Sequence, residues 1–347
     1  MKKVGVIVPC YNAEEYIDRC MDSLINQTLG IDHMELFFVD DASTDGTYEK
    51  LLQYEKQYPE SICVIHCEEN HRQGAARNIA LQYVTAEYVG YVDIDDWCEY
   101  NMFEIMYSRA AEYECDFVFC DFVRDDGISK DSVFGEIRAA MNREDELYIL
   151  DDDNKVKEFL VAGKCGTAPW QKLCKKSILV DNDISFLENI SYEDNYWSGL
   201  LFLYAKRICR VSQKLYHYYV NDNSTTLIKN NTRHYELFDV IINLWEEYKK
   251  RGLYKIYGDA LEYHFIRAYY WQGMKMLCIR FDNPDYAVFV KMCETVNLAV
   301  PDWADNHYIK DYTTEFYQQL ISLTRPVPAE ADFAIIVSLV RKYYGAE

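Results

Sequence analysis

The sequence predicts an α/β protein with a mainly parallel central sheet, followed by a helical C-terminal domain. Short apolar runs alternate with helical patterns over about the first 125 residues, which is the pattern of a βαβ series. From about Thr232 onward, apolar residues recur at helical spacing. The length of 347 residues exceeds what one hydrophobic core usually supports, so we expect two domains.

The first domain is expected to contain five strands. Each is a short, mostly apolar run, which is typical of a strand buried in a parallel sheet. The predicted strands span 4–8, 36–39, 62–65, 88–92 and 117–120.

Helical patterns connect these strands. Tyr16, Cys20 and Leu24 recur at helical spacing after the first strand. A second helix is expected to begin near 43–45, where Ser, Thr and Asp oxygens can cap it. A third helix has an apolar face made of Ala75, Ala76, Ile79, Ala80 and Tyr83. The polar, acidic stretch 125–153 has weak periodicity, so we expect a loop or an irregular excursion there.

The C-terminal part is expected to be a small helical domain. Two stripes of large residues recur at helical spacing, and such stripes are typical of packing between helices. The stripes are Tyr235, Phe238, Ile242, Trp245 and Tyr248, and then Tyr263, Ile266, Tyr270 and Met274.

Composition excludes several classes of protein. The chain has 57 acidic and 36 basic residues, a net charge of -21, which argues against a general nucleic-acid binder. We expect no secretion signal, because the N-terminus has too few apolar residues for a signal-peptide core. The apolar run 333–340 is shorter than the roughly 20 residues of a membrane span. The 12 scattered cysteines fit reduced thiols. We therefore expect a cytoplasmic protein.

Acidic residues follow three of the predicted strands. The segments 9–12, 40–43 and 93–97 come directly after the first, second and fourth strands. Ligands of open parallel sheets bind beyond the carboxyl ends of the strands, so these segments should meet at one site. Crowded carboxylates repel one another unless a cation separates them, and oxygen ligands suit Mg²⁺ or Mn²⁺. The sequence therefore predicts a divalent metal.

Three other α/β interpretations are each excluded, because a residue that their motif requires is missing. A dinucleotide-binding enzyme needs a glycine-rich turn after the first strand, and 9–12 contains no glycine. A P-loop would need a glycine where this sequence has Glu158 and a hydroxyl residue where it has Cys165. In an aspartyl phosphatase the nucleophilic aspartate would fall at Ser43.

Four ordered motifs carry a family resemblance. They are Val6-Ile-Val-Pro-Cys-Tyr-Asn12, Val39-Asp-Asp-Ala-Ser-Thr-Asp-Gly46, Gly74-Ala-Ala-Arg-Asn78 and Tyr91-Val-Asp-Ile-Asp-Asp-Trp97. Together they resemble the family 2 glycosyltransferases with the GT-A fold, of the bacterial surface-polysaccharide type. The resemblance implies a GT-A domain at 1–225, with a nucleotide-binding half (1–125) and an acceptor half (126–225). The helical domain, 226–347, lies outside it.

The resemblance implies how a UDP-sugar would bind. Asp41 is expected to accept a hydrogen bond from the uracil, with Pro9 and Tyr11 lining the base and ribose. Arg77 is expected to reach the base or phosphates as a fixed cation. A turn or cap role for Asp41 and a plain surface role for Arg77 are the alternatives.

The same resemblance identifies an Asp-x-Asp motif. Asp95 is expected to be the direct ligand of Mn²⁺ or Mg²⁺. Asp93 is expected to hold the ribose or complete the metal shell, and Asp96 to face the donor sugar. A solvated acidic turn is the alternative, but the buried-type residues Tyr91 and Trp97 flank the acids.

The acceptor half must supply a base, since a sugar hydroxyl has too high a pKa to attack unaided. Tyr192-Glu193-Asp194 resembles the family's Glu-Asp pair, with Asp194 as the base and Glu193 as a neighbour that orients the acceptor. An adjacent acid raises the proton affinity of the other. A pair of acids favoured by the helix dipole is the alternative.

Two further residues are weaker candidates. Trp170-Gln171-Lys172-Leu173 resembles a segment that presents a lysine, Lys172, beneath the acceptor site. Tyr219 occupies the place where many relatives carry an arginine near the diphosphate, which leaves phosphate contact there in doubt. His217 could substitute as a metal or phosphate ligand, although a lone histidine among tyrosines is more often structural.

The function expected from this resemblance is inverting, metal-dependent transfer of one sugar from a UDP-sugar to an acceptor hydroxyl. The sequence lacks Gln-x-x-Arg-Trp, the signature of processive synthases. The expected acceptor is a glycan or lipid-linked glycan, with peripheral contact at the inner membrane face. A catalytically silent sugar-nucleotide binder and a metal-dependent phosphohydrolase are the alternatives.

Overall fold

A computed structural model describes residues 2–125, 144–220 and 228–346. Contacts divide the chain into two compact units. The first unit comprises Met1–Asp151 and Cys165–Asn221, and the second comprises Asp152–Lys164 and Asp222–Glu347.

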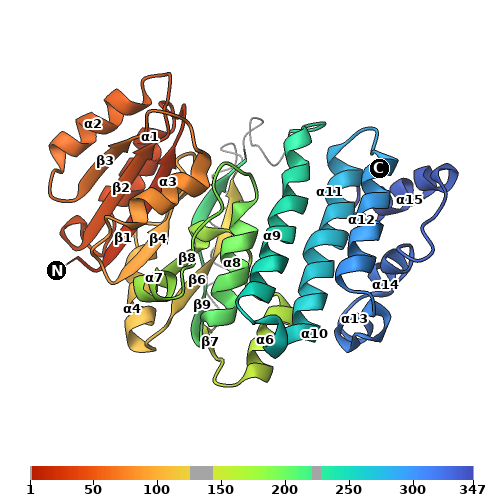
Figure 1. Ribbon diagram of the computed structural model, residues 1–347. Coiled ribbons are helices and arrows are strands. Elements are labelled where there is room, and N and C mark those ends of the chain that lie inside the picture. Colours follow the sequence, from red (N-terminus) through yellow and green to blue (C-terminus); the bar gives the residue numbers. More distant parts are fainter. Residues whose placement is uncertain (1, 126–143, 221–227, 347) are drawn as a thin grey trace. The chain divides into compact units, whose positions relative to one another are not determined.

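The first unit is built on one mixed sheet of nine strands in the described residues, in the order β3-β2-β1-β4-β8-β6-β9-β5 with β7 paired to β9 (Figure 1). The strands are β1 (Val4–Cys10), β2 (Met34–Asp40), β3 (Ile62–His66), β4 (Tyr88–Tyr91), β5 (Trp97–Cys98), β6 (Phe117–Asp125), β7 (Glu146–Ile149), β8 (Lys172–Lys175) and β9 (Arg207–Tyr219). These bounds confirm the five predicted strands.

Parallel pairing holds the first four strands together. β1 pairs with β2 and β4, and β2 pairs with β3, all in parallel. β8 then lies antiparallel between β4 and β6, and β6 pairs with β9 in parallel. The fold is therefore α/β with a sheet that is parallel in its first half and mixed in its second.

Helices connect and cover the strands. α3 contacts β1 and β2, α2 contacts β3, and α4 contacts β6 and β9 (Figure 1). A large buried cluster of this unit lies between the sheet and the helices α1, α2 and α4. The helices are α1 (Ile17–Ile25), α2 (Thr47–Gln57), α3 (Arg72–Leu81), α4 (Met102–Glu112), α7 (Lys176–Asp181) and α8 (Glu193–Tyr204).

Register brings the ends of the parallel strands to one edge. Cys10 lies opposite Asp40, and Asp40 lies opposite His66. Ile7 lies opposite Tyr91 at the end of β4. The loops that follow β1, β2 and β4 therefore leave the sheet at the same edge, as the sequence predicted, and the loop after β3 joins them there.

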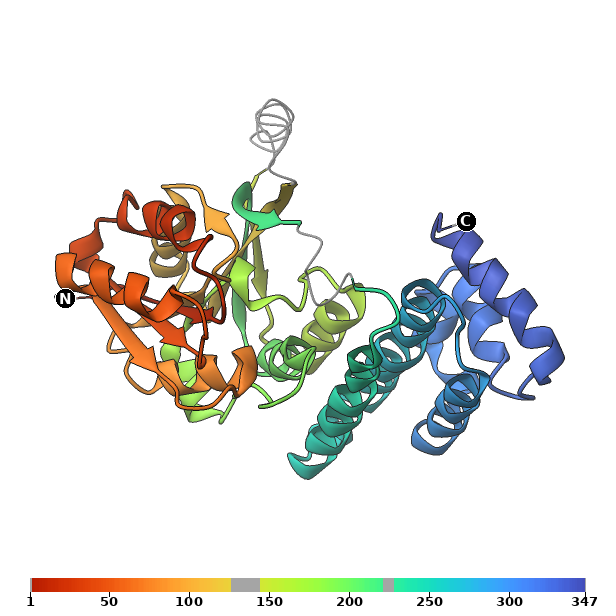
Figure 2. The same ribbon diagram turned by 90° about the horizontal axis from the view of Figure 1, so that it is seen from above.

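The second unit is helical in its described residues, as expected, and its chain runs from teal to blue in Figure 2 apart from α6. A π-helical segment, Ile266–Trp271, joins two of its helices. The helices are α6 (Asp153–Ala162), α9 (Glu236–Lys250), α10 (Tyr254–Phe265), α11 (Gln272–Arg280), α12 (Tyr286–Ala299), α13 (His307–Asp311), α14 (Glu315–Ser322) and α15 (Glu330–Tyr343).

The segment 152–164 differs from the expected division at 1–225 and 226–347. It forms α6 and packs on α10, with an ion pair of 2.9 Å between Lys157 and Asp259. The side chain of Asp152 accepts from the Lys155 N–H at the start of α6, and Gly163 ends the helix at φ 59°. Buried apolar residues of α6 therefore join the core of the second unit.

The acidic stretch 125–153 is only partly described. Residues 126–143 lie outside the described residues. Glu146–Ile149 forms β7 and pairs antiparallel with β9, so the expectation of a loop or irregular excursion is wrong there. Sheet pairing with a strand some 60 residues away supplied the order that local periodicity did not show.

Within the described residues, no helix has both the length and the apolar character to cross a bilayer. All 12 cysteines are unpaired, as expected for reduced thiols.

Candidate active site

Two of the acidic-edge loops are tied to each other by side chains. The Asn12 amide oxygen accepts from the Thr44 N–H at 2.8 Å, and the Asn12 N–H donates to Ser43 Oγ at 3.0 Å. Asn12 has φ 47°, a left-handed conformation that asparagine tolerates better than most residues. Pro9 is half-buried at the end of β1, whereas Tyr11 is 51% exposed. The aromatic face of Tyr11 is therefore accessible at this edge.

Asp41 links the loop after β2 to the loop before α3. One carboxylate oxygen accepts from the His71 N–H at 2.8 Å, and the Asp41 carbonyl accepts from Asn70 Nδ2 at 3.1 Å. The Asp41 N–H donates to the Cys10 carbonyl at 2.8 Å. Asp41 is thus held on both sides at the acidic edge, and its contact with a uracil stays a prediction.

The three acids after β4 have different surroundings. Both oxygens of Asp96 are used inside the protein: one accepts from Tyr216 Oη and the other from the Tyr219 N–H, each at 2.7 Å. Burial raises the pKa of Asp96 well above its usual range, and Asp95 and Asp93 raise it further. Asp96 therefore fastens this loop to β9, and its expected contact with a donor sugar stays a prediction.

Asp95 is held through its backbone. Its carbonyl accepts from Arg19 Nη2 of α1 at 2.7 Å. The Arg19 guanidinium lies over the rings of Trp97 and Tyr219, at 4.0 and 4.5 Å from their centroids. The Asp95 side chain is half-buried at the loop. A cation from α1 therefore lies beside Tyr219, where the sequence lacks the arginine of many relatives.

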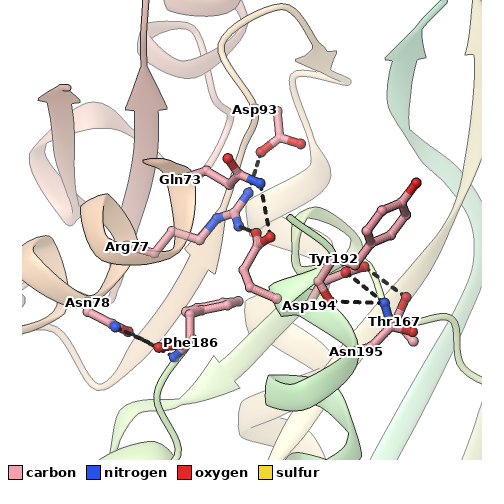
Figure 3. A network of polar contacts seen from close by, with 10 residues as sticks. Gln73, Arg77, Asn78, Asp93, Thr167, Phe186, Tyr192, Asp194 and Asn195 are labelled. Atoms are coloured by element: carbon pink, nitrogen blue, oxygen red, sulfur yellow. Dashed lines mark hydrogen bonds and ion pairs between the residues drawn. The ribbon is translucent and has the colours of Figure 1, made fainter. Parts of the chain in front are cut away.

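Arg77 joins the two acidic motifs of the sequence (Figure 3). From α3, its Nη2 donates to Asp93 at 2.8 Å and its Nη1 donates to Glu193 at 2.6 Å. The Arg77 side chain is only 4% exposed. Although burial lowers it, the pKa of Arg77 is held above its usual value by these two carboxylates. Arg77 is therefore a buried, paired cation and not a surface residue.

Glu193 is a buried acid of the site. Gln73 donates to its second carboxylate oxygen at 2.9 Å, beside the bond from Arg77. The pKa of Glu193 is raised to about 7, because burial and the neighbouring Asp194 raise it more than the attraction of Arg77 lowers it. Through these contacts, Glu193 connects the start of α8 to α3.

Asp194 lies next to Glu193 but has a separate set of contacts (Figure 3). Its Oδ2 accepts from Thr167 Oγ1 at 2.8 Å, and its Oδ1 accepts from Asn195 Nδ2 at 3.0 Å. Asp194 is partly exposed, whereas Glu193 is buried. Of the two acids, Asp194 is therefore the one that a substrate can reach.

Local backbone conformation fixes where this acid pair lies. Tyr192, just before α8, has φ 67°, a conformation that is costly for a residue with a bulky side chain. Gly74 of α3 approaches the same helix start, because a Cβ there would lie 2.3 Å from the Leu187 carbonyl oxygen and 3.1 Å from Glu193 Cγ. The glycine of the third motif thus permits α3 to approach Glu193.

Lys172 and His217 lie inside the protein. The Lys172 ammonium donates to the carbonyls of Gly166 and Ala168, both at 2.6 Å. His217 stacks on Trp97 and bonds to Glu99 at 2.8 Å. Lys172 therefore supports a loop, and His217 belongs to a packed polar cluster; a direct role for either in binding stays a prediction.

A divalent cation fits the donor chemistry of Asp93 and Asp95 only if the substrate contributes ligands. Among the described residues, no three His, Cys, Asp or Glu side chains are grouped as a protein metal cage. Mg²⁺ and similar ions are commonly held by one or two carboxylates together with substrate phosphates. Two aspartates on one loop match that mode of binding.

Several residues of this site escaped the sequence reasoning. Thr167 and Gln73 are ordinary polar residues without a motif of their own, and Tyr216 looks like a core aromatic. Arg19 has a weak signal, since it is the one basic residue in a helical pattern next to an acidic edge. Their roles come from contacts between distant segments, which no local pattern reports.

The fold and the acidic edge agree with the GT-A fold class that the sequence predicted. The family described as "Glycosyl transferase family 2" matches residues 5–162. Residues 5–162 of the chain therefore contain a domain of this glycosyltransferase family. The motifs that suggested the family lie within or beside the matched residues, so that prediction is confirmed.

Curated relatives agree with the family. The putative glycosyltransferase EpsH of Bacillus subtilis is 31% identical over 229 residues, which are 64% of this chain and 62% of the relative. The poly(ribitol-phosphate) beta-glucosyltransferase of Bacillus spizizenii is 29% identical over 219 residues, 63% of this chain and 32% of the relative. The chain thus spans under two thirds of the length of either protein.

A solved structure shows the same fold. S. aureus TarS 1–349 has a TM-score of 0.66 and 21% identity, covering 94% of this chain and 93% of that chain. The likeness extends beyond the family match of residues 5–162 and includes the C-terminal helices. It confirms the predicted GT-A fold class.

Proposed function

We propose that this protein transfers one sugar from a UDP-sugar to a hydroxyl of a glycan or lipid-linked glycan, with inversion at the anomeric carbon. The observation that carries the proposal is the Arg77 side chain, which bonds to Asp93 and to Glu193. Through it, the acids after β4 and the acids that begin α8 belong to one site. The residues proposed to bind the UDP-sugar and the acid proposed as the base would then act on the same donor and acceptor.

The donor would bind at the edge of the first four strands. Asp41 would accept from the uracil, with Pro9 and Tyr11 beside the base and ribose. Arg77, already paired, would contribute by fixing Asp93 in place for the ribose or metal. Support comes from S. aureus TarS 1–349, whose structures include complexes with UDP-GlcNAc and with UDP. Donor sugar identity is a separate question for the assay below.

Mn²⁺ or Mg²⁺ would be held by Asp95, with Asp93 as a second oxygen ligand. When bound, such a cation neutralises the diphosphate charge that develops as UDP departs. A mannosyltransferase from Pyrobaculum calidifontis, with a TM-score of 0.51 and 15% identity to this chain, is solved with GDP-Man and Mn²⁺. Arg19, bonded to the Asp95 carbonyl, would keep the loop in place.

The chemical step would use Asp194 as general base. The acceptor hydroxyl gives its proton to the Asp194 carboxylate as its oxygen bonds to the anomeric carbon. The bond from that carbon to the UDP oxygen breaks on the opposite face, which inverts the configuration. Glu193 would hold α8 against α3 through Arg77 and Gln73, and so set the position of Asp194.

A membrane-bound acceptor would require peripheral contact with the bilayer. The basic run 249–251 does not form an unpaired patch for this, since Lys249, Lys250 and Arg251 pair with Glu246 and Glu247. These ion pairs partly neutralise the run, which makes it a weak candidate for contact with anionic lipid headgroups.

The testing experiment measures UDP and GDP release from a panel of nucleotide sugars, with and without Mn²⁺ and with and without glycan acceptors. Acceptor-dependent UDP release and a new glycan product are expected. UDP release at a rate that acceptors do not change would favour a phosphohydrolase. Metal-dependent UDP binding without release on any acceptor would favour a silent binder.

A further inference from the structure

The candidate base is held by a residue outside the family motifs. Thr167 Oγ1 donates to Asp194 Oδ2 at 2.8 Å, while Asn195 Nδ2 donates to Oδ1 at 3.0 Å (Figure 3). Both carboxylate oxygens are thus bonded, which fixes the plane of the group. Asn195 is the next residue of α8, but Thr167 comes from the loop between α6 and β8. A loop residue needs its own support to act as a fixed donor.

That support comes from a buried ammonium. Lys172 Nζ donates to the carbonyls of Gly166 and Ala168, each at 2.6 Å, and these two residues flank Thr167. A single ammonium group therefore bonds to the loop on both sides of the threonine. The peptide groups next to Thr167 cannot rotate without breaking one of these bonds.

The surroundings of this cation are unusual for a lysine. Lys172 is fully buried, and within the described ranges it forms no ion pair with a carboxylate. Its ammonium lies 6.0 Å and 5.7 Å from the ring centroids of Trp197 and Phe202, both on α8. Burial of an ammonium without a carboxylate is costly, so an apolar residue would stabilise the fold more simply.

We propose that Lys172 and Thr167 are positioning residues for Asp194. Lys172 fixes the loop 166–168, the loop presents the Thr167 hydroxyl, and the hydroxyl orients the carboxylate toward the acceptor. The inference rests on the proposed function, in which Asp194 is the base. The hydrogen bonds of Thr167 and Lys172 described above involve none of the donor-side acids. Their loss should therefore slow the chemical step and spare donor binding.

The decisive variants are Thr167→Val and Thr167→Ser. Valine keeps the shape and loses the donor, whereas serine keeps the donor. A misplaced base of this kind costs on the order of 10- to 100-fold, so Thr167→Val should lower kcat by that factor with donor KM within about twofold. Thr167→Ser should recover most of kcat. A role confined to folding would not separate kcat from KM in this way.

Thr28→Val is the matched control. The Thr28 hydroxyl also donates to a carboxylate, that of Glu104, on the exposed surface of the same unit. Its replacement removes the same kind of bond away from α8. We expect kcat and KM of this control to equal those of the wild type.

Lys172→Met tests whether Lys172 fixes the loop 166–168. If Lys172 acts through Thr167, the double variant Lys172→Met/Thr167→Val should be no slower than the slower single variant, since coupled residues are not additive. Multiplying effects would overturn the link between the two residues. Circular dichroism and thermal unfolding check that Lys172→Met folds; if it does not, the Thr167 pair decides alone.

The outcomes separate this inference from the proposed function. Full kcat in Thr167→Val, together with a slow Asp194→Asn, would overturn the positioning role and leave the transferase proposal standing. A rise in donor KM with unchanged kcat would also overturn it. Absence of transfer by the wild type on every acceptor would overturn the proposed function and this inference with it.

Discussion

Arg77 and Glu193 form a buried ion pair of 2.6 Å between residues 116 positions apart in the sequence. Each side chain is 4% exposed. The pair joins α3 of the nucleotide-binding half to the first residue of α8. Because Arg77 also bonds to Asp93, substitution of Arg77 or Glu193 should change both the stability of the protein and the geometry of the site.

Arg77→Met should destabilise the protein strongly. Removing one partner of a buried pair leaves the other charge uncompensated, which typically costs about 3–5 kcal/mol. Urea unfolding of wild type and variant measures this difference. Lys175→Met is the control, since Lys175 is 38% exposed in its pair with Glu87, and exposed pairs contribute about 0–1 kcal/mol. Equal losses for the two variants would contradict the buried role of Arg77.

Glu193 should make stability depend on pH. Its pKa is raised from 4.5 to about 7 in the folded protein, so the folded state binds the proton more tightly than the unfolded state. Its contribution is fully present below about pH 4.5 and is lost as pH rises through about 7. Relative to Glu193→Gln, the wild type should lose up to about 1.4 kcal/mol per pH unit in this window.

The measurement is the free energy of unfolding of both proteins at pH 4.5, 5.5, 6.5 and 7.5. Subtraction of the Glu193→Gln curve removes the contribution of the other titrating groups. A flat difference across the window would show that Glu193 ionises at its ordinary pKa in the folded protein.

Removal of the divalent metal should weaken UDP binding. With Mn²⁺, UDP at about 100 times its dissociation constant should add roughly 2.7 kcal/mol to stability, and EDTA should remove most of this gain. Equal stabilisation by UDP, GDP and ADP would argue against a uracil contact at Asp41. Thermal unfolding measures the stability with UDP and Mn²⁺, after addition of EDTA, with GDP and with ADP.

Asp95→Ala should abolish the metal-dependent part of UDP binding while the fold survives, because Asp95 lies on a loop. Titration calorimetry with and without Mn²⁺ measures this part. Asp18→Ala provides the control, since the Asp18 side chain is 66% exposed on α1 and should leave binding unchanged. Wild-type affinity in the Asp95 variant would remove Asp95 from the metal ligands.

Asp194→Asn should lower kcat by roughly 10² to 10⁴, the usual contribution of a positioned base. The amide keeps the shape and cannot take the acceptor proton. Donor KM should stay within a small factor, since the donor-side acids are untouched. Steady-state kinetics with a saturating acceptor separates the two constants. A normal rate in this variant would transfer the role of base to another group.

Much of the fold could be predicted locally. The first four strands are apolar runs at ordinary spacing, and parallel pairing in register brings the segments after them to one edge. That edge therefore follows from the order of strands and helices alone. The antiparallel insertion of β8 between β4 and β6, and the pairing of β7 with β9, had no local signal. β7 is only 4 residues long and follows an acidic stretch of weak periodicity.

The sequence by itself determined the family, the acidic edge and the identity of the candidate acids, because motif spacing and side-chain chemistry are properties of the chain. Only the tertiary structure decided which acids are enclosed. Asp96 is bonded to β9 and Glu193 to Arg77, whereas Asp194 stays partly exposed beside Thr167. Burial and pairing depend on which distant segments meet, and that is set by the packing of the whole unit.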